Sequence, residues 1–219
     1  MVLALVLACA ARLEPQQGGA PHPNRFDPHF RKYTKRFFGP AFDWRHFKAQ
    51  GLAESGLDAA ARSRSGARGI MQLMPSTLEL IRSRAPDLES VDNPEMNIAA
   101  GIKHNRALWG MWGRAATPLD QRRFMFASYN AGLMTILRAQ RMARRRRLDP
   151  TLWASIETVS ARVWQWRQRQ TILYLRKIER LFERLDEDGR LGPSRPNGAK
   201  VSTKPITGGV SRSGGAGRR

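Results

Sequence analysis

The sequence predicts an all-α fold for residues 40–187. Apolar residues recur there at helical spacing, and the alternating β-branched runs typical of strands are almost absent. Pro75, Pro94 and Pro118 precede helical patterns, and proline is favoured in the first turn because its missing N–H would have no partner there. We therefore expect helices joined by short loops, without an internal repeat of 20–50 residues.

Composition bounds the function. The chain has 219 residues and a formal net charge of +20, and its mean hydropathy is −0.50. These values fit one domain with tails and exclude an acidic disordered chain or a polytopic membrane protein. A single cysteine excludes an internal disulfide and a Cys-based zinc site. The excess of basic residues favours nucleic acid, anionic lipid or an anionic cell-wall polymer as partner, and composition does not choose among them.

The chain divides into four segments. Residues 1–11 are apolar and too short to span a bilayer, residues 12–39 are rich in proline and predict a linker with little helix, and residues 40–187 form the expected helical domain. Residues 188–219 hold eight glycines and no aromatic residue, which predicts a disordered basic tail that serves solubility or attachment to an anionic polymer.

The first segment suggests export. Residues 6–9 (Val-Leu-Ala-Cys) resemble a bacterial lipobox, which predicts an exported protein of the periplasm or cell envelope, anchored to the membrane through lipidated Cys9, with an outer-membrane lipoprotein as one form. No basic residue precedes the apolar run, and Cys9 lies early. A start upstream, a chance match or a frayed hydrophobic end are the alternatives.

Six helices are expected in the central segment. The first starts after Asp43 as cap and stops at Gly56. A run of four arginines at 144–147 is expected to be the solvated end of a helix. The expected ranges are 44–54, 77–84, 94–109, 118–131, 133–147 and 161–185.

Glu54 is the residue whose position suggests chemistry. It ends an otherwise apolar helix face and precedes a loop rich in Gly and Ser. Burial raises the pKa of a carboxyl group, which is how a general acid is tuned for neutral pH. By spacing alone, however, a lone glutamate at a helix end is more often a surface or capping residue. Neither a phosphate-binding Gly-Lys motif nor His spacing suited to a metal is present.

Three blocks in order resemble the catalytic domain of soluble-type lytic transglycosylases, which are relatives of goose-type lysozyme. The first contains Glu54-Ser55, then Ser63 and residues 66–75 (Gly-Ala-Arg-Gly-Ile-Met-Gln-Leu-Met-Pro). The second and third are residues 97–101 (Asn-Ile-Ala-Ala-Gly) and 128–132 (Ser-Tyr-Asn-Ala-Gly). A fourth, weaker block covers 171–178. The resemblance implies a lysozyme-like (goose-type) all-α fold.

The resemblance also implies an activity. Glu54 would act as acid and then base in cleaving the β-1,4 bond between N-acetylmuramic acid and N-acetylglucosamine of peptidoglycan, leaving a 1,6-anhydro end. No metal or cofactor is implied, and the protein is expected to act as a monomer on glycan strands rather than on a specific nucleic acid. The substrate-binding positions that the resemblance implies are Ser63, Gln72, Met74, Tyr129, Asn130 and Tyr174.

Ser128, Ala59 and Gln170 depart from the family pattern, and Gln170 replaces a frequent Glu. Two other interpretations stay open: a hydrolytic muramidase on the same fold, for which Asp58 is the first candidate as second carboxylate, and a non-catalytic basic helical protein that binds cell-wall polymer or nucleic acid. We interpret Asp58 itself as a loop or capping residue.

Overall fold

A computed structural model of the chain describes residues 24–83 and 92–193. Within these ranges the structure contains helices and isolated β-bridges but no strand, which confirms the all-α prediction. The elements are α1 (Asp27–Phe38), α2 (Arg45–Ser55), α3 (Pro75–Arg82), α4 (Pro94–Met111), α5 (Pro118–Ala131), α6 (Leu133–Arg145), α7 (Trp153–Val159), the 3-10 helix η1 (Ser160–Arg162) and α8 (Gln168–Arg184).

Most expected helices are present. Prolines open α3, α4 and α5, and α5 has the predicted bounds. The predicted cap Asp43 accepts a hydrogen bond at Oδ1 from the backbone N–H of Arg45, at 2.9 Å. The expected helix 161–185 is wrong at its start, because the chain turns after η1 and α8 begins only at Gln168. Helix α7 was not expected.

The predicted linker is wrong for residues 27–38, which form α1. The proline of this segment lies in the first turn of the helix, where it is tolerated. Helix α1 packs against α4 and α2, and it buries Phe30 and Tyr33 almost completely. The packed unit therefore includes residues before 40.

The predicted disordered tail is likewise wrong for its first residues, 188–193. Leu185 and Leu191 form an antiparallel bridge around a turn, and Gly189 is buried there against Trp44. A Cβ at Gly189 would come within 2.3 Å of the Trp44 ring, so the close approach requires glycine. Composition did not reveal this contact because both partners are distant in sequence.

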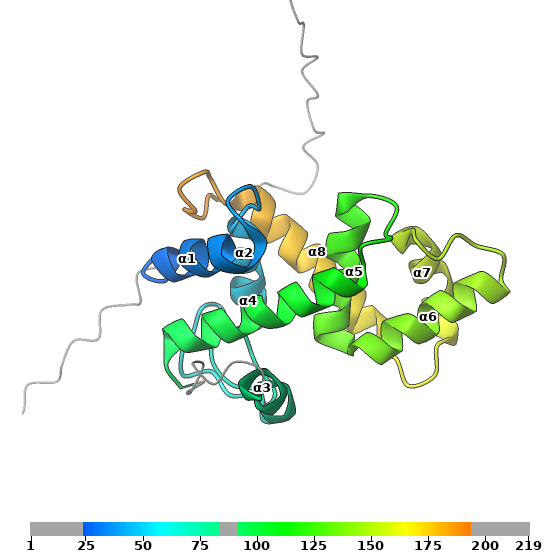
Figure 1. Cartoon of the computed structure of the whole chain (residues 1–219), viewed down its shortest axis with the longest axis horizontal. Helices are drawn as coiled ribbons and strands as arrows, with labels where there is room; N and C mark the ends of the chain where they lie inside the picture. The colour runs from blue at the N-terminus through cyan, green and yellow to red at the C-terminus, as the bar shows by residue number, and fades with distance from the viewer. Residues whose placement is uncertain (1–23, 84–91, 194–219) are drawn as a thin grey trace, which may run out of the picture.

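Helix α8 links the two halves of the molecule (Figure 1). It packs against α2 and against α5, while α4 packs between α1 and α5, and α6 packs against α5 and α7. The shared core consists of aliphatic and aromatic side chains from nearly every helix, among them Phe47, Ile98, Phe124, Ile136 and Trp153. Burial of this apolar surface is the main driving force for the arrangement.

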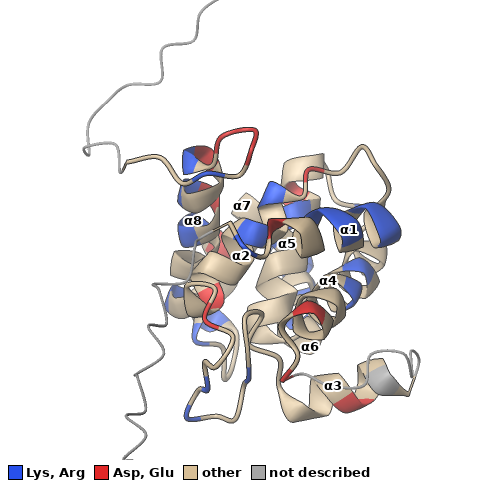
Figure 2. Ribbon diagram, turned by 90° about the vertical axis from the view of Figure 1, so that its left-hand side faces the viewer, with Lys and Arg blue, Asp and Glu red and all other residues tan. Residues whose placement is uncertain are grey.

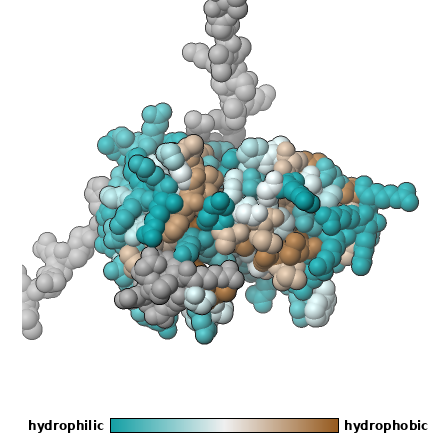
Figure 3. Space-filling view, in the orientation of Figure 1, coloured by the Kyte–Doolittle hydropathy of each residue, from teal (hydrophilic) through white to brown (hydrophobic). Residues whose placement is uncertain are grey.

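The surface is basic and largely hydrophilic. Figure 2 shows Lys and Arg along α1 and α8, and the four arginines at 144–147 are exposed at the end of α6, as expected. Figure 3 shows a mostly hydrophilic face interrupted by apolar patches. Exposed apolar side chains include Trp164, Met134 and Leu173.

Residues 1–11, with Cys9, and residues 194–219 lie outside the described part of the chain, so the expectations about them stay predictions. Among the described residues, no helix combines the length and the apolar character that a membrane crossing requires.

Candidate active site

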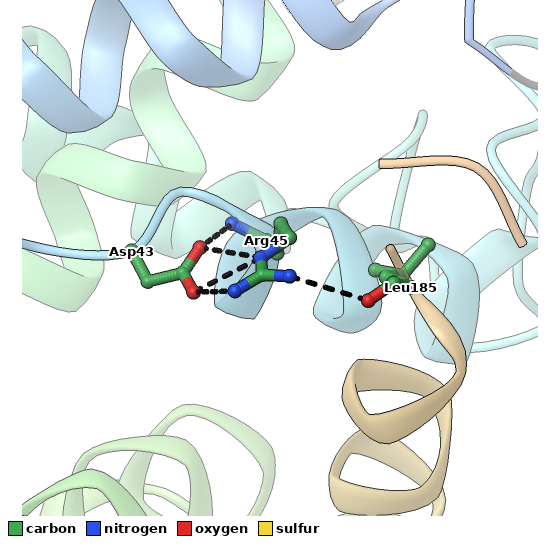
Figure 4. A network of polar contacts seen from close by, with 3 residues as sticks. All are labelled: Asp43, Arg45 and Leu185. Atoms are coloured by element: carbon green, nitrogen blue, oxygen red, sulfur yellow. Dashed lines mark hydrogen bonds and ion pairs between the residues drawn. The ribbon is translucent and has the colours of Figure 1, made fainter. Parts of the chain in front are cut away.

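Helices α2 and α8 run antiparallel and build the site between them. At one end, Nη1 of Arg45 donates a hydrogen bond to the carbonyl oxygen of Leu185 at 3.3 Å, and the same guanidinium pairs with Asp43 (Figure 4). At the other end, Lys177 of α8 contacts the backbone of α2 at Ala53. These contacts fix the alignment of the two helices, and so the position of Glu54 in the last turn of α2.

The end of α2 follows from one glycine. Gly56 has a left-handed backbone (φ +68°) and donates its N–H to the carbonyl oxygen of Leu52, as a C-terminal helix cap does. Ser55 Oγ then donates to the carbonyl oxygen of Ile70 at 2.9 Å, so the loop after residue 60 is held against the helix end. Glu54 therefore sits where helix and loop meet.

Glu54 has a neutral hydrogen-bond donor. The hydroxyl of Tyr174 donates to Glu54 Oε1 at 2.6 Å. Burial disfavours the charged carboxylate and raises the pKa of Glu54 to about 7, although the bond from Tyr174 and the charge of Lys177 act in the opposite direction. A carboxyl group with this pKa can both give and take a proton near neutral pH.

The charge of Lys177 acts on the pKa of Glu54, but Lys177 does not form an ion pair with this acid. Its Nζ donates instead to the carbonyl oxygen of Ala53 at 2.6 Å. Among the described residues, Glu54 makes no ion pair. An ion pair would hold Glu54 as a carboxylate. The lack of an ion pair at Glu54 among the described residues therefore fits a side chain that has to carry a proton.

Tyr129 closes the site from α5. Its hydroxyl donates to the carbonyl oxygen of Met71 at 2.7 Å. Burial, and the charge of nearby Glu54, raise the pKa of Tyr129 well above its usual value, and the pKa of Tyr174 rises for the same two reasons. The structure thus places Tyr174 in hydrogen-bond contact with Glu54, and Tyr129 close enough for the charge of Glu54 to raise its pKa.

The loop beneath these residues is held by Asn97 of α4. Its Oδ1 accepts from the backbone N–H of Met71 at 2.8 Å, and its Nδ2 donates to the carbonyl oxygen of Arg68 at 3.0 Å. Gly69 has φ +73°, and a Cβ there would meet Asn97 at 2.3 Å. A Cβ at Gly101 would meet Met71 at 2.7 Å. The two glycines therefore allow the close packing that places Met71 under Tyr129.

The other expected site residues do not contact Glu54 by hydrogen bonds among the described residues. Ser63 closes a turn by accepting from the N–H of Ala67 at 2.9 Å. The Gln72 amide donates to two carbonyl groups of its own loop, and Met74 is 39% exposed before α3. Asn130 accepts from Thr171 at 3.0 Å.

Asp58, the candidate second carboxylate, is exposed, and its Oδ1 accepts from the N–H of Ala60 at 2.8 Å. It is a turn residue on the loop beyond Gly56. Among the described residues, no group of three or more His, Cys, Asp or Glu side chains is placed to hold a metal ion.

Spacing and composition missed three residues that contact this site: Lys177, and the buried amides Gln50 and Asn105. Gln50 lies one helical turn before Glu54 and donates to the Tyr174 hydroxyl at 3.1 Å, and Asn105 donates to Gln50 at 2.7 Å. The available signal was a glutamine four residues before the glutamate, which places both on one helix face.

A cavity among α2, α5 and α8 does not include Glu54. It has a volume of about 260 Å³ and is lined by His46, Arg122, Phe126 and Phe182, among others, but not by Glu54. The His46 ring stacks on Phe182 with 3.9 Å between centroids, and burial lowers its pKa to about 4. This cavity is therefore separate from the candidate site at Glu54.

Residues 40–150 match the family model for the transglycosylase SLT domain. This match covers half of the chain, and the protein belongs to this family.

Two relatives show how far the likeness extends. The membrane-bound lytic murein transglycosylase F of Desulfosudis oleivorans is 31% identical over 137 residues, which cover 62% of this chain and 28% of that protein. The protein of the same name from Pseudomonas fluorescens is 26% identical over 141 residues, or 64% of this chain and 27% of that protein. The chain thus spans about a quarter of the length of the curated relatives it matches.

The fold also has solved counterparts. The 70 kDa soluble lytic transglycosylase of Escherichia coli matches with a TM-score of 0.54 and 24% identity, covering 71% of this chain and 23% of that one. A complex of the 70 kDa soluble lytic transglycosylase with bulgecin A matches with a TM-score of 0.52 and 23% identity. The expected lysozyme-like helical fold is confirmed by this likeness.

Proposed function

We propose that the protein is a peptidoglycan lytic transglycosylase that cleaves the β-1,4 bond between N-acetylmuramic acid and N-acetylglucosamine without water. One observation carries the proposal: Glu54, in a chain of the SLT family, is a partly buried carboxyl group with a pKa raised to about 7 and a tyrosine as its hydrogen-bond partner. The names of the relatives support the same substrate.

In the proposed reaction Glu54 begins as the neutral acid and protonates the glycosidic oxygen as the bond breaks. Positive charge develops on the muramic ring, as in other glycosidases. The resulting Glu54 carboxylate, stabilised by the Tyr174 hydroxyl, removes the proton from the 6-hydroxyl of the same sugar. That oxygen attacks C1 and forms the 1,6-anhydro ring, and Glu54 regains its proton.

A single carboxylate suffices for this route, because the nucleophile is part of the substrate and is held near C1. Hydrolysis normally needs a second carboxylate across the bond. Among the described residues, the groups that shift the pKa of Glu54 are Tyr174 and Lys177 rather than another acid, and this supports the non-hydrolytic route over the muramidase alternative.

We propose further that Tyr129 and Tyr174 shape the acid's surroundings, that Ser63, Gln72, Met74 and Asn130 contact the glycan, and that the protein works as an exported monomer of the cell envelope. The names of the membrane-bound relatives support an envelope location. Lipidation of Cys9, with an outer-membrane lipoprotein as one form, remains part of this proposal. The domain bounds proposed from the sequence need extension to include α1 and residues 188–193.

The test is mass spectrometry of muropeptides released from purified peptidoglycan, with Glu54→Gln beside the natural protein. The natural protein should release anhydro products, one water lighter than hydrolytic ones, and Glu54→Gln should lower the rate by at least about a thousandfold while keeping the helical circular dichroism spectrum. Reducing-end products would contradict the non-hydrolytic route. Equal release by the variant would contradict the role of Glu54.

A further inference from the structure

We propose that Gln50 and Asn105 are positioning residues that set the direction of the hydrogen bond from Tyr174 to Glu54, so that Oε1 of the acid always accepts and its proton resides on Oε2. This inference rests on the proposed function of Glu54 and extends it to two amides that none of the motifs contains. A directional chain of hydrogen bonds runs from Asn105 through Gln50 and Tyr174 to the acid.

The chain starts at a backbone carbonyl group. Nδ2 of Asn105 donates to the carbonyl oxygen of Gly101 at 3.0 Å. A carbonyl oxygen only accepts, so this bond fixes which end of the Asn105 amide carries the NH2 group. The same NH2 group supplies its second hydrogen to Gln50 Oε1 at 2.7 Å.

The direction passes from Asn105 through Gln50 to the tyrosine. Because Oε1 of Gln50 accepts from Asn105, its Nε2 has to face Tyr174, and it donates to the hydroxyl oxygen at 3.1 Å. With its oxygen already accepting from Gln50, Tyr174 directs its single proton to Glu54 Oε1 at 2.6 Å. The amides thus leave the tyrosine one role, that of donor to the acid.

Burial makes this direction stable. Gln50 and Asn105 are both 0% exposed, and a buried polar group is costly to leave without a partner. Asn105 Oδ1 has no hydrogen-bond partner among the described residues, yet turning the amide over would place this oxygen against the carbonyl oxygen of Gly101. The orientation of the Asn105 amide in the structure is therefore the one that avoids two facing acceptors.

Two consequences follow for the acid. A hydroxyl that itself accepts a bond is a stronger donor, because bonds in a chain polarise one another, so Gln50 helps Tyr174 to stabilise the Glu54 carboxylate formed after the first proton transfer. The proton of the neutral acid is restricted to Oε2. Besides Tyr174, the described groups whose charge is coupled to Glu54 are Lys177 of α8 and Tyr129 of α5. The ring centroid of Tyr129 lies 5.2 Å from that of His104 in α4.

The test measures the pKa of Glu54 directly, by NMR titration of its carboxyl carbon in protein labelled at glutamate, with the resonance assigned by its loss in Glu54→Gln. Gln50→Met, which keeps the shape and removes the amide, should raise the pKa of Glu54 by about half a unit, and Tyr174→Phe should raise it by about one unit or more. Asn105→Leu should act in the same direction as Gln50→Met.

Two comparisons distinguish an effect of the hydrogen-bond chain from a general loss of structure. The double variant Gln50→Met/Asn105→Leu should shift the pKa no further than Gln50→Met alone, because both belong to one chain. Thr34→Val, a buried polar-to-apolar change in α1 outside the chain of bonds, should leave the pKa unchanged. In turnover assays, Gln50→Met should move the alkaline limb of the kcat profile upward and lower kcat about tenfold at unchanged KM.

An unchanged pKa in Gln50→Met, beside a raised pKa in Tyr174→Phe, would overturn the proposal, as would a double variant whose shift is the sum of the two single shifts. If Gln50→Met does not fold, Asn105→Leu alone decides between the same outcomes. The titration needs no substrate. A protein that cleaves no peptidoglycan would therefore contradict the proposed function without contradicting the role of the hydrogen-bond chain.

Discussion

Helix α2 carries two ionisable side chains that are withdrawn from solvent, the buried Lys48 and the partly buried Glu54, and their hydrogen-bond partners differ. Lys48 is 1% exposed and pairs with Asp27 at 2.6 Å, and it also donates to Asn24 and to the carbonyl oxygen of Gly189 at 2.8 Å each. Glu54, less than two turns further on, has a tyrosine hydroxyl instead of a cation.

The difference separates a structural charge from a chemical one. A buried charge is tolerated when an opposite charge and hydrogen bonds surround it, and Lys48 has all of these. Glu54 has no ion pair with Lys177, because the Lys177 ammonium donates to a backbone carbonyl group instead. Lys48 is thus held in its charged form by its partners, whereas Glu54 can change its protonation state.

The largest effect on stability is expected at Lys48, the lysine with the structural ion pair. Lys48→Met removes the partner of the buried Asp27 and should lower the free energy of unfolding by about 3–5 kcal/mol, as measured by urea denaturation at pH 7. Lys35→Met, which changes an exposed lysine of α1, should change it by less than about 0.5 kcal/mol. Equal stability of the two variants would contradict a stabilising role for the buried ion pair of Lys48.

An effect of opposite sign is expected at Glu54. Burial raises its pKa from 4.5 to about 7, so the folded state holds a proton that the unfolded state releases, and the free energy of unfolding falls as the pH rises from about 4.5 to 7. Glu54→Gln removes this loss. The variant should be more stable than the natural protein by roughly 2–3 kcal/mol at pH 8 and equally stable at pH 4.

Paired urea titrations at the two pH values measure this difference. A variant that is less stable than the natural protein at pH 8 would mean that the Glu54 carboxylate is well solvated or paired, as a structural residue would be.

The smallest effect concerns Lys177. Its charge lowers the pKa of Glu54, but the side chain is exposed and solvent weakens the interaction. Lys177→Met should therefore raise the pKa of Glu54 by only about half a unit or less, seen as an upward shift of the alkaline limb of the rate profile. Arg180→Met, another exposed cation of α8, serves as the matched control and should leave the profile in place. A shift of two units would mean that Lys177 and Glu54 form an ion pair in solution.

Local signals predicted much of the fold. Prolines in first turns gave the starts of α3, α4 and α5, and the glycine after Glu54 gave the end of α2. Helix α1 was missed because the density of prolines before residue 29 suggested a linker, whereas what stabilises this helix is burial of Phe30 and Tyr33 against distant elements. That information is not local and so is absent from any window of the sequence.

The candidate site divides in the same way. The position of Glu54 followed from its helix end and from the ordered motif blocks. The glycines and the asparagine of these blocks are required for close packing, because Gly69 packs against Asn97 and Gly101 against Met71, to which Asn97 is hydrogen-bonded. The hydrogen bonds that surround the acid join residues up to 124 positions apart, as between Gln50 and Tyr174. Spacing places Gln50 on the helix face of Glu54, but it does not show that Tyr174 and Asn105, which are distant in sequence, are its hydrogen-bond partners.

The turn at Gly189 has a consequence for how the protein can be shortened. Its carbonyl oxygen is one of three acceptors of the buried Lys48 ammonium. A protease that trims the chain back to residue 187 would take away that acceptor, uncover the Trp44 ring beside it and loosen the anchor of α2. Trimming after residue 193 would spare all of these contacts. Within the described residues, the contacts of Lys48 near the start of the chain thus determine how far the other end can be shortened without loss of stability.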